Sequence, residues 1–318
     1  MRESALGADA GAARRMKEET AVDLSFDGRV AVVTGAGGGL GRAHALELGR
    51  RGAKVVVNDM GTSLSGDGEE QGRAAVVAKE IEELGGTAVP DTNSVATVEG
   101  GRAVIDTALS AFGRVDIVVN NAGILRDKTF HNTGPGDVDP VLDVHLKGAF
   151  NVTRPAWARF REQGFGRVVV TSSSAGFFGN FGQSSYAAAK LALVGLIKVL
   201  AIEGRKYDIR ANAIGPVAQT RMTEGFDNPL ADHLDPALVS AVVAYLCHDS
   251  CDLSGEVLSA GGGRVARVFI GVTRGYLNGD LTAEDVRDHL TEIFDDAGYQ
   301  VPENSMAEMT LLADMLGK

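Results

Sequence analysis

Cysteine is scarce in this chain. Only Cys247 and Cys251 occur among 318 residues, both in the segment CHDSC. A histidine between two cysteines resembles part of a metal site, but the segment lacks the paired cysteine and histidine clusters that hold structural zinc. Free thiols persist where the surroundings are reducing. We therefore expect two free thiols, no metal, and a cytoplasmic protein.

An excess of basic residues is also lacking. The chain has 31 Lys and Arg against 42 Asp and Glu, a net charge of −11, which argues against nucleic acid or an anionic membrane as a partner. No apolar stretch is long and uninterrupted enough to predict a bilayer span. With 44% hydrophobic residues, the composition is that of a globular protein with a substantial core.

The first 24 residues lack the apolar core of a secretory signal. They begin with MRESALGADAGAARRMKEET, which is polar and rich in small residues. We therefore expect a disordered N-terminal extension over residues 1–24. Met16 is an alternative start site, in which case residues 1–15 are no part of the native protein.

A glycine-rich turn follows the first predicted strand. Arg29–Thr34 (RVAVVT) is a nearly continuous apolar run, typical of a parallel strand buried on both faces. GAGGGLG then covers Gly35–Gly41, and residues 42–52 are typical of a helix. Glycines let a backbone approach a pyrophosphate, and a helix N-terminus offers it free N–H groups. Three spaced glycines are a weak signal among 41, but the second strand, Lys54–Asn58 (KVVVN), supplies the expected context.

An acidic residue ends that second strand. Asp59 lies 18 residues beyond Gly41, where a carboxylate would accept hydrogen bonds from the adenosine ribose. A carboxylate there also repels a 2′-phosphate, so the predicted cofactor is NAD(H) rather than NADP(H). The alternative is an aspartate that merely caps the next turn. The preceding glycine motif favours the cofactor.

The segment SSSAGFFGNFGQSSYAAAK carries the predicted chemistry. Ser173 stands thirteen residues before Tyr186, and Lys190 four after it. Tyr186 and Lys190 therefore share one face of a helix, where an ammonium would lower the pKa of the phenol. Such a phenol can exchange a proton with an alcohol or carbonyl oxygen, and a nearby serine can hold that oxygen. The alternative is an ordinary surface pair of Tyr and Lys.

Strands and helices alternate along the rest of the chain, which predicts an α/β fold. Their spacing implies a doubly wound parallel sheet with helices on both faces, in a single domain. Further strands are predicted at residues 87–90, 115–120 and 167–171, and further helices at about 98–112 and 137–161.

The helix that begins near Tyr186 has no polar face. From Tyr186 to Glu203, 14 of 18 residues are apolar, and a helix that is apolar all round must be covered on its outer side too. The sheet covers one side only, so we expect a second subunit on the other, in a homodimer or homotetramer. The alternative is a helix buried within one large monomer.

Four motifs in order resemble the short-chain dehydrogenase/reductase superfamily, a Rossmann fold. They are TGAGGGLG at 34–41, NNAG at 120–123, Ser173 with YAAAK at 186–190, and NAIGP at 212–216. Longer segments, among them NNAGILRDKTF and AIEGRKYDIRANAI, are similar to the (3R)-hydroxyacyl-CoA dehydrogenase unit of peroxisomal multifunctional enzymes. The resemblance implies NAD-dependent interconversion of a (3R)-3-hydroxyacyl-CoA and its 3-ketoacyl-CoA. Because the chain is too short for the hydratase domain and ends in LGK, we expect a stand-alone bacterial cytosolic relative.

The resemblance also implies roles for individual residues. Tyr186 would be the acid/base, Ser173 the oxyanion stabiliser, and Lys190 both a partner of the tyrosine and a ligand of the nicotinamide ribose. The remaining cofactor-binding residues would be Gly35, Gly39, Leu40, Gly41, Asp59, Asn93, Ser94, Val95 and Asn121. Two residues depart from the superfamily: Asn93 replaces an adenine-facing Asp, and His145 replaces an Asn that supports a proton-relay water. His145 is equally well explained as a buried structural histidine.

The substrate side is less well defined. Residues 217–235 follow the sixth strand and should cover the substrate, and Arg126, Lys128 and Arg221 are candidate partners for the anionic CoA. We divide the chain into the extension 1–24, a dehydrogenase domain 25–263, and a partly helical extension 264–318 with a capping box at 282–285. Alternative functions are reduction of a carrier-protein-bound, steroid or other ketone, or a non-catalytic dinucleotide-binding scaffold.

Overall fold

The computed structural model describes residues 24–63, 65, 72–219 and 230–317. The predicted N-terminal extension therefore lies outside the described residues, except for residue 24. The predicted α/β fold is confirmed: one eight-stranded sheet has the order β3-β2-β1-β4-β5-β6-β7-β8, and only the last pair is antiparallel. The strands are β1 (Val30–Thr34), β2 (Lys54–Asn58), β3 (Thr87–Asp91), β4 (Ile117–Asn120), β5 (Gly166–Thr171), β6 (Ile209–Pro216), β7 (Val257–Gly261) and β8 (Arg264–Val268).

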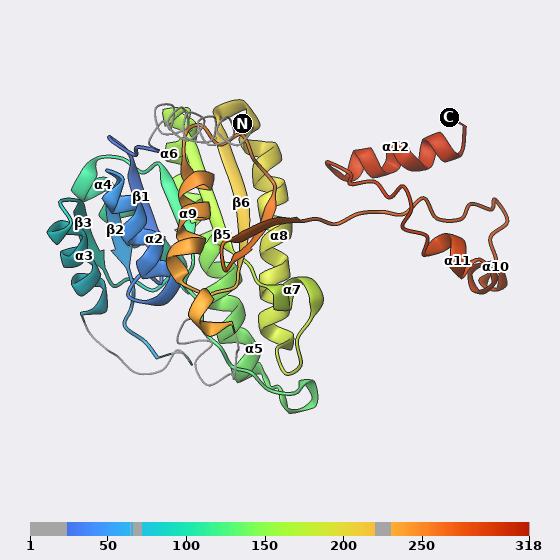
Figure 1. The fold of residues 1–318 in the computed structure, drawn as a ribbon, viewed down its shortest axis with the longest axis horizontal. Coiled ribbons are helices and arrows are strands. Elements are labelled where there is room, and N and C mark those ends of the chain that lie inside the picture. Colours follow the sequence, from blue (N-terminus) through green and yellow to red (C-terminus); the bar gives the residue numbers. More distant parts are fainter. Residues whose placement is uncertain (1–23, 64, 66–71, 220–229, 318) are drawn as a thin grey trace, which may run out of the picture.

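Helices cover both faces of this sheet (Figure 1). They are α2 (Gly39–Arg50), α3 (Arg73–Glu83), α4 (Val98–Phe112), α5 (Pro135–Leu142), α6 (Gly148–Gln163), α7 (Ser174–Phe178), α8 (Ser184–Gly204), α9 (Pro236–Cys247), α10 (Ala283–Asp288), α11 (Leu290–Ile293) and α12 (Ser305–Met315). Helices α2, α3 and α9 share one apolar core with the sheet, and α4, α6 and α8 share the other.

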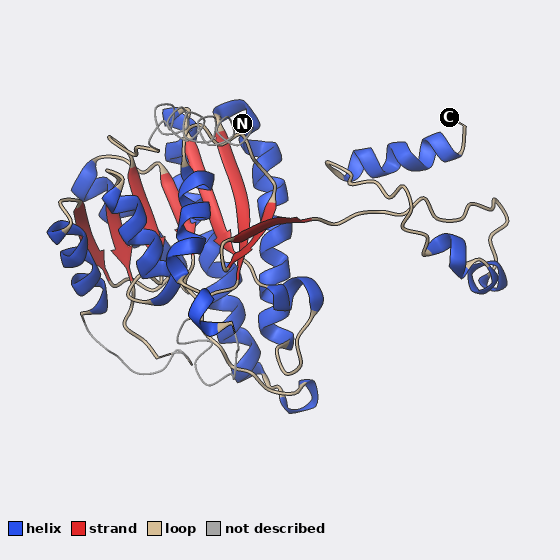
Figure 2. Ribbon diagram, in the orientation of Figure 1, coloured by secondary structure: helices blue, strands red, loops and turns tan. Residues whose placement is uncertain are grey.

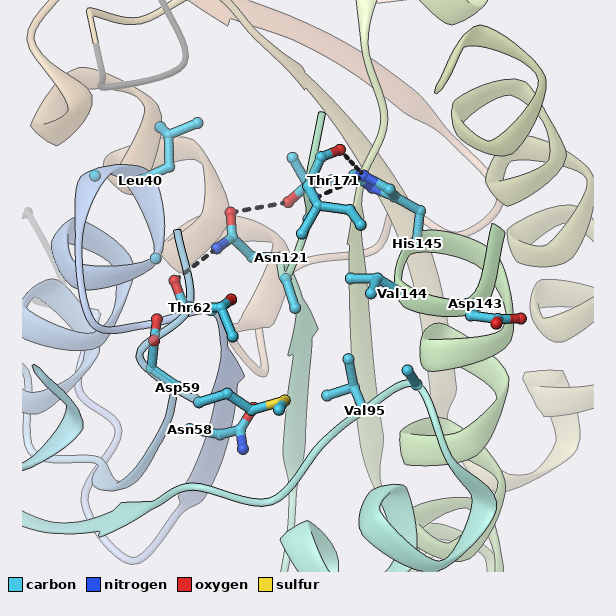
Figure 3. Close-up of a pocket in the computed structure, with 18 of the residues that line it drawn as sticks. Leu40, Asn58, Asp59, Thr62, Val95, Asn121, Asp143, Val144, His145 and Thr171 are labelled. Atoms are coloured by element: carbon cyan, nitrogen blue, oxygen red, sulfur yellow. Dashed lines mark hydrogen bonds between the residues drawn. The ribbon is translucent and has the colours of Figure 1, made fainter. Parts of the chain in front are cut away.

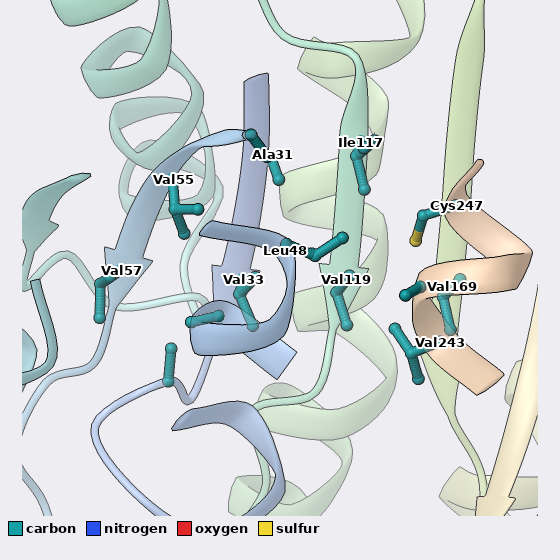
Figure 4. Packing of buried hydrophobic residues seen from close by; sticks show 14 of the residues in the cluster. Ala31, Val33, Leu48, Val55, Val57, Ile117, Val119, Val169, Val243 and Cys247 are labelled. Carbon is teal, nitrogen blue, oxygen red and sulfur yellow. The ribbon is translucent and has the colours of Figure 1, made fainter. Parts of the chain in front are cut away.

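The buried strands explain why the sequence shows continuous apolar runs instead of alternation. In β1, Ala31 and Val33 pack with α2 and α9, whereas Val30 and Val32 pack on the opposite face. Figure 4 shows the first of these clusters, in which Leu48 of α2 and Val243 of α9 meet the strand side chains. A parallel strand that is covered on both faces has no solvent side and needs no polar positions.

The chain reverses its winding direction between β1 and β4. Strand β1 pairs with β2 on one side and with β4 on the other, so the two following connections run to opposite faces of the sheet. Ligands of doubly wound sheets bind at such a point, beyond the carboxyl ends of the strands. The order of the strands therefore places a binding cleft beside the glycine-rich turn that follows β1.

The helix predicted at about 137–161 is present, but it contains a π-helical turn that the sequence did not predict. Helix α5 ends at Leu142, a π-helical turn covers Asp143–Lys147, and α6 begins at Gly148. The turn holds the His145 side chain inward, where Nε2 lies 3.0 Å from Ile124 N and 2.8 Å from Ile124 O. Such π-helical turns often occur at functional sites. Helical periodicity in the sequence does not reveal such a turn.

Residues 269–317, here called the C-terminal arm, extend away from the body of the molecule (Figure 2). Its helices α10, α11 and α12 bury no residue. The arm has local order of its own: Val272 and Gln300 exchange two backbone hydrogen bonds, and the rings of Phe269 and Tyr299 stack. The predicted capping box opens α10. Strand β8 lies beyond residue 263, so the sheet continues past the domain boundary drawn from the sequence.

The expectation that no segment is long and apolar enough for a membrane span is also wrong. The segment Ser184–Tyr207, which contains α8, meets that criterion by length and composition. A single such helix is weak support for a membrane protein, because core helices of soluble proteins meet the same criterion. One side of α8 packs on the sheet through Leu193 and Ile197.

Candidate active site

A cavity of about 400 Å³ opens at the carboxyl ends of the central strands. Every catalytic and cofactor-binding residue predicted from the sequence lines it. In Figure 3, Asn58 and Asp59 mark one end of the cavity, His145 and Asp143 the other, and Asn121 and Thr171 lie between them. The predicted set is Gly35, Gly39, Leu40, Gly41, Asp59, Asn93, Ser94, Val95, Asn121, Ser173, Tyr186 and Lys190.

The glycine-rich turn is packed too closely for side chains. Gly35 has φ +64°, and a Cβ on Gly41 would lie 2.2 Å from the Gly35 carbonyl oxygen. The turn therefore presents bare backbone to the cavity at the start of α2. A pyrophosphate fits this arrangement, because backbone N–H groups at a helix N-terminus attract anions. Gly37, absent from the predicted set, belongs to the turn as well.

The Asp59 carboxylate is held in place by the backbone. Its Oδ2 accepts a hydrogen bond from Gly37 N at 2.9 Å, and its Oδ1 accepts one from Gly61 N at 2.7 Å. These bonds tie the end of β2 to the glycine turn after β1. The carboxylate retains acceptor capacity toward the cavity, so it suits a ligand with hydroxyl donors, such as a ribose.

Ser173, Tyr186 and Lys190 come from two neighbouring helices. Ser173 is the N-cap of α7, directly after β5, and Tyr186 and Lys190 occupy the first two turns of α8. Lys190 Nζ donates a 2.5 Å hydrogen bond to the Thr171 carbonyl and lies 5.5 Å from the centre of the Tyr186 ring. The structure thus gathers the three residues beside the cavity.

The electrostatics of this trio differ from the prediction. Burial raises the pKa of Tyr186, and a hydrogen bond with the Ser173 side chain offsets this only in part. Burial also lowers the pKa of Lys190 to about 7. The side-chain amine of Lys190 is therefore only partly protonated near neutral pH, and its charge does not dominate the pKa of the phenol. The predicted lowering of the Tyr186 pKa by Lys190 is wrong for this structure, because desolvation outweighs the attraction.

Asn121 braces the three central strands. Its Nδ2 donates to the carbonyls of Thr34 and Gly35 at 3.1 and 3.2 Å, and its Oδ1 accepts from Thr171 Oγ1 at 3.4 Å. These contacts join β1, β4 and β5 directly below the cavity. Asn121 thus links the glycine turn to the end of β5.

His145 is buried beside Tyr186 and Lys190. Its ring meets the Tyr186 ring edge-on, with centroids 5.2 Å apart. Burial, together with the nearby Lys190 charge, holds the pKa of His145 well below its usual value. Among the described residues, Nδ1 has no hydrogen-bond partner. His145 is therefore a neutral group that packs against the catalytic side chains.

Asp91 was missed by the sequence reasoning. This buried residue ends β3, and its carboxylate accepts hydrogen bonds from Asn58 Nδ2, Asn93 N, Asn93 Nδ2 and Thr107 Oγ1 at 2.7 to 3.0 Å. The only local signal is its position at a strand end, in PDTNSV. Asn93 is a close neighbour in the sequence, whereas Asn58 and Thr107 come from β2 and α4.

The substrate side is only partly described. Of the three candidate cations, Arg126 lines the cavity and Lys128 forms an ion pair with Asp137 at 2.8 Å. Arg221 lies outside the described residues, as does much of the segment 217–235. Lys128 is thus paired with a carboxylate. Among the described residues, Arg126 and Lys190 are the Arg and Lys side chains that line the cavity.

Comparison with known proteins identifies the family. The model of the short chain dehydrogenases matches residues 29–229, so the chain belongs to the short-chain dehydrogenase family and is an oxidoreductase. More particularly, it resembles the dehydrogenase unit of peroxisomal multifunctional enzyme type 2. The Drosophila melanogaster enzyme is 48% identical over 278 residues, 86% of this chain and 46% of the relative. The structure of that full-length enzyme has a TM-score of 0.78 and 38% identity, covering 92% of this chain and 50% of the other.

Two mycobacterial relatives match over nearly their whole length. A putative short-chain type dehydrogenase/reductase of Mycobacterium tuberculosis is 50% identical over 275 residues, 86% of this chain and 96% of the relative. A hydroxyacyl-CoA dehydrogenase of the same organism is 35% identical over 322 residues, 94% of this chain and 97% of the relative. The multifunctional enzymes are longer, and this chain spans about half the length of the Drosophila enzyme.

The expected cytoplasmic location is contradicted by the names of the relatives. Similar proteins from fruit fly, mouse, Dictyostelium discoideum, Neurospora crassa and Saccharomyces cerevisiae are all named as peroxisomal. These names point to peroxisomes rather than to the cytoplasm, although the mycobacterial protein matches as well. Composition and two free cysteines do not distinguish one reducing compartment from another, which is why the sequence reasoning failed here.

Proposed function

We propose that this chain is an NAD-dependent dehydrogenase that interconverts a secondary alcohol and a ketone, with (3R)-3-hydroxyacyl-CoA and 3-ketoacyl-CoA as the substrate pair. One observation carries the proposal: Ser173, Tyr186 and Lys190 line the same cavity as the glycine turn and Asp59. A proton-transfer group and a dinucleotide cradle are thus combined in one site. A non-catalytic scaffold would have no need for this trio.

The nicotinamide, when bound, would supply or accept the hydride. The chain's own residues handle the substrate oxygen. Tyr186 Oη gives a proton to that oxygen during reduction and takes it back during oxidation. Ser173 Oγ donates a hydrogen bond to the same oxygen and stabilises its negative charge. Lys190, fixed by the Thr171 carbonyl, would hold the nicotinamide ribose.

The choice of NAD(H) over NADP(H) rests on Asp59. Its carboxylate is aligned by Gly37 N and Gly61 N, where it would accept from ribose hydroxyls and repel a 2′-phosphate. The Arg73 side chain begins close to the same turn, because a Cβ on Gly37 would lie 2.8 Å from the Arg73 Cβ. A cation that could attract a 2′-phosphate is therefore near as well. NADPH is therefore the essential comparison in any binding experiment.

The substrate class rests on the relatives. The name hydroxyacyl-CoA dehydrogenase belongs to a protein that matches nearly this whole chain. Arg126 on the cavity wall is suited to a phosphate of the anionic CoA. The alternative within the family is reduction of a carrier-protein-bound, steroid or other ketone.

A spectrophotometric screen separates these alternatives. NADH formation is followed with (3R)- and (3S)-hydroxyacyl-CoAs of several chain lengths, and NADH or NADPH consumption with 3-ketoacyl-CoA, a carrier-protein thioester and a ketosteroid. We expect turnover with the (3R)-hydroxyacyl-CoA and NAD. Turnover restricted to the carrier protein or the steroid would establish the alternative.

The proton-transfer role is tested by Tyr186→Phe. We expect turnover to fall by at least about a hundredfold, as is usual for the loss of a general acid/base, while NADH binding changes little. Tyr207→Phe is the matched control, because Tyr207 lies near the far end of α8, outside the cavity. Near-wild-type turnover in the Tyr186 variant would refute the mechanism.

We also propose that the chain forms a homodimer or homotetramer through α8. The outer side of this helix leaves Leu191, Val199 and Ile202 about half exposed, at 45%, 51% and 53%. The same helix buries Leu193 and Ile197 against the sheet. An outer helix with apolar side chains on its solvent side is a surface that a second copy can cover.

A further inference from the structure

The helix that carries Tyr186 begins without a side-chain cap. Its N-cap is Gln183, which makes no side-chain hydrogen bond to the first turn of α8. An N-cap side chain commonly accepts from a backbone N–H of that turn. The Gln183 backbone does start the helix, because its carbonyl accepts a 2.7 Å hydrogen bond from Ala187 N. The Gln183 side chain is therefore directed to a partner outside the helix.

That side chain joins α8 to the segment that follows β4. Its Nε2 donates a 2.7 Å hydrogen bond to Asp127 Oδ2, and its Oε1 accepts one from Asn180 Nδ2 at 2.9 Å. The backbone supports the same junction, because Lys128 N donates to the Gly182 carbonyl at 2.8 Å. Since a carboxylate only accepts, the amino end of Gln183 must face Asp127. Both ends of the carboxamide are thus occupied.

The segment after β4 is itself anchored to other parts of the site. Asn121 bonds to the end of β1 and to the glycine turn, and Lys128 forms a 2.8 Å ion pair with Asp137 at the start of α5. Tyr186 lies only three residues beyond Gln183 and belongs to the first turn of α8. A contact at Gln183 therefore holds the turn that presents the phenol to the cavity.

We infer that Asp127 and Gln183 are positioning residues for the proton transfer: their side-chain contact fixes the start of α8 and thereby places the Tyr186 hydroxyl. Neither residue lines the cavity. The inference rests on the proposed function and adds two residues outside the cavity to it. A displacement of about 1 Å can cost roughly a hundredfold in rate, whereas an exposed hydrogen bond adds little to the free energy of unfolding. Loss of the contact should therefore slow turnover without unfolding the protein.

An exchange of donor and acceptor tests the contact. In Gln183→Glu, two carboxylates face each other and the contact is lost, although Asn180 can still donate to position 183. Adding Asp127→Asn restores the contact, because the new carboxamide donates to the new carboxylate. Gln163→Glu is the matched control, because Gln163 also donates a 2.7 Å hydrogen bond, to the Val115 carbonyl, but at the C-terminal end of α6.

Two quantities are measured for each variant. They are the turnover of (3R)-hydroxyacyl-CoA with NAD, and the hydrogen exchange of amides 184–190 in the free enzyme. We expect Gln183→Glu to lower kcat by about tenfold, with little change in KM, and to speed the exchange. The double variant should recover both properties, and Gln163→Glu should change neither.

Asp127→Asn alone separates position from charge. Its carboxamide oxygen can still accept from Gln183 Nε2, so it should lose less turnover than Gln183→Glu. Burial is the main cause of the raised pKa of Tyr186, and the Asp127 charge raises it further. Removing that charge should move the ascending limb of the pH profile for alcohol oxidation to lower pH, by about half a unit. The other groups that face the phenol are the same in both proteins: Ser173, Lys190 and His145.

The possible results separate this inference from the proposed function. A double variant that recovers slow hydrogen exchange but not kcat would show a merely structural contact and overturn the positioning role. Wild-type kcat in Gln183→Glu, or a limb that moves to higher pH in Asp127→Asn, would also count against it. If Gln183→Glu does not fold, by circular dichroism, Asp127→Leu removes the same contact and takes its place. Wild type without turnover on any screened substrate would refute the proposed function, and this inference with it.

Discussion

His44 should make the stability of this protein sensitive to mild acid. The side chain lies on α2, fully buried against α9, with Nδ1 2.8 Å from Ser240 Oγ. Its Nε2 has no partner among the described residues. Burial lowers the pKa of His44 from 6.5 to about 3, because the low-dielectric core disfavours the charged ring.

The sign and size of the effect follow from proton linkage. Between pH 6.5 and about 3, the unfolded chain binds a proton at His44 that the folded chain does not. Stability contributed by the neutral ring is therefore complete above pH 6.5 and is lost as the pH falls through this range. Between about pH 7.5 and about pH 5, the loss is roughly 2 kcal/mol at 1.36 kcal/mol per pH unit.

The assay is urea unfolding, followed by circular dichroism at both pH values. In His44→Gln, which cannot titrate but keeps a polar group near Ser240, the difference in unfolding free energy between the two pH values should shrink by about 2 kcal/mol. The pKa of His145 is also lowered, but His145 is present in both proteins and cancels in the comparison. The same substitution at the exposed His131 is the control. An unchanged pH dependence in His44→Gln would refute the reasoning.

Two further substitutions test the glycine-rich turn and the proposed subunit interface. Gly41→Ala places a Cβ 2.2 Å from the Gly35 carbonyl oxygen, so we expect about 1–3 kcal/mol of destabilisation and NADH binding weakened by about tenfold or more. Gly195→Ala, where nothing lies within 4 Å, is the matched control; equal NADH affinity in both variants would contradict the tight-turn argument. Ile202→Asp puts a charge on the exposed apolar side of α8 and should yield monomers in sedimentation velocity, whereas an unchanged oligomer would place the interface elsewhere.

Local patterns in the sequence predicted the parts of the fold that depend on local chemistry. Valine runs indicate strands buried on both faces, and glycines followed by a helix indicate a backbone cradle. The π-helical turn between α5 and α6 was beyond such patterns, because it coincides with a contact between His145 and Ile124 that helical periodicity does not show. The pKa of Tyr186 was mispredicted for a related reason. Spacing reveals that Lys190 is near, but not how much water the fold removes from both groups.

The residues of the site could likewise be predicted only in part. Asp59 could be predicted because it lies a fixed distance beyond the glycine motif on the next strand. Asp91 could not, because its significance comes from Asn58 and Thr107, which join it only when β2, β3 and α4 are assembled. Sequence reasoning thus identifies residues that face a ligand more readily than residues that orient them.

The C-terminal arm and the central sheet should differ in how readily their backbone hydrogen bonds open locally. Helices α10 to α12 bury no residue, whereas every residue of β1, β4 and β5 is buried. In an isolated chain, amide hydrogens of the arm should therefore exchange with solvent close to the unprotected rate, while those of the sheet exchange only on global unfolding. A protease would likewise cut first within the arm. Slow exchange in α12 would then report that another surface covers it.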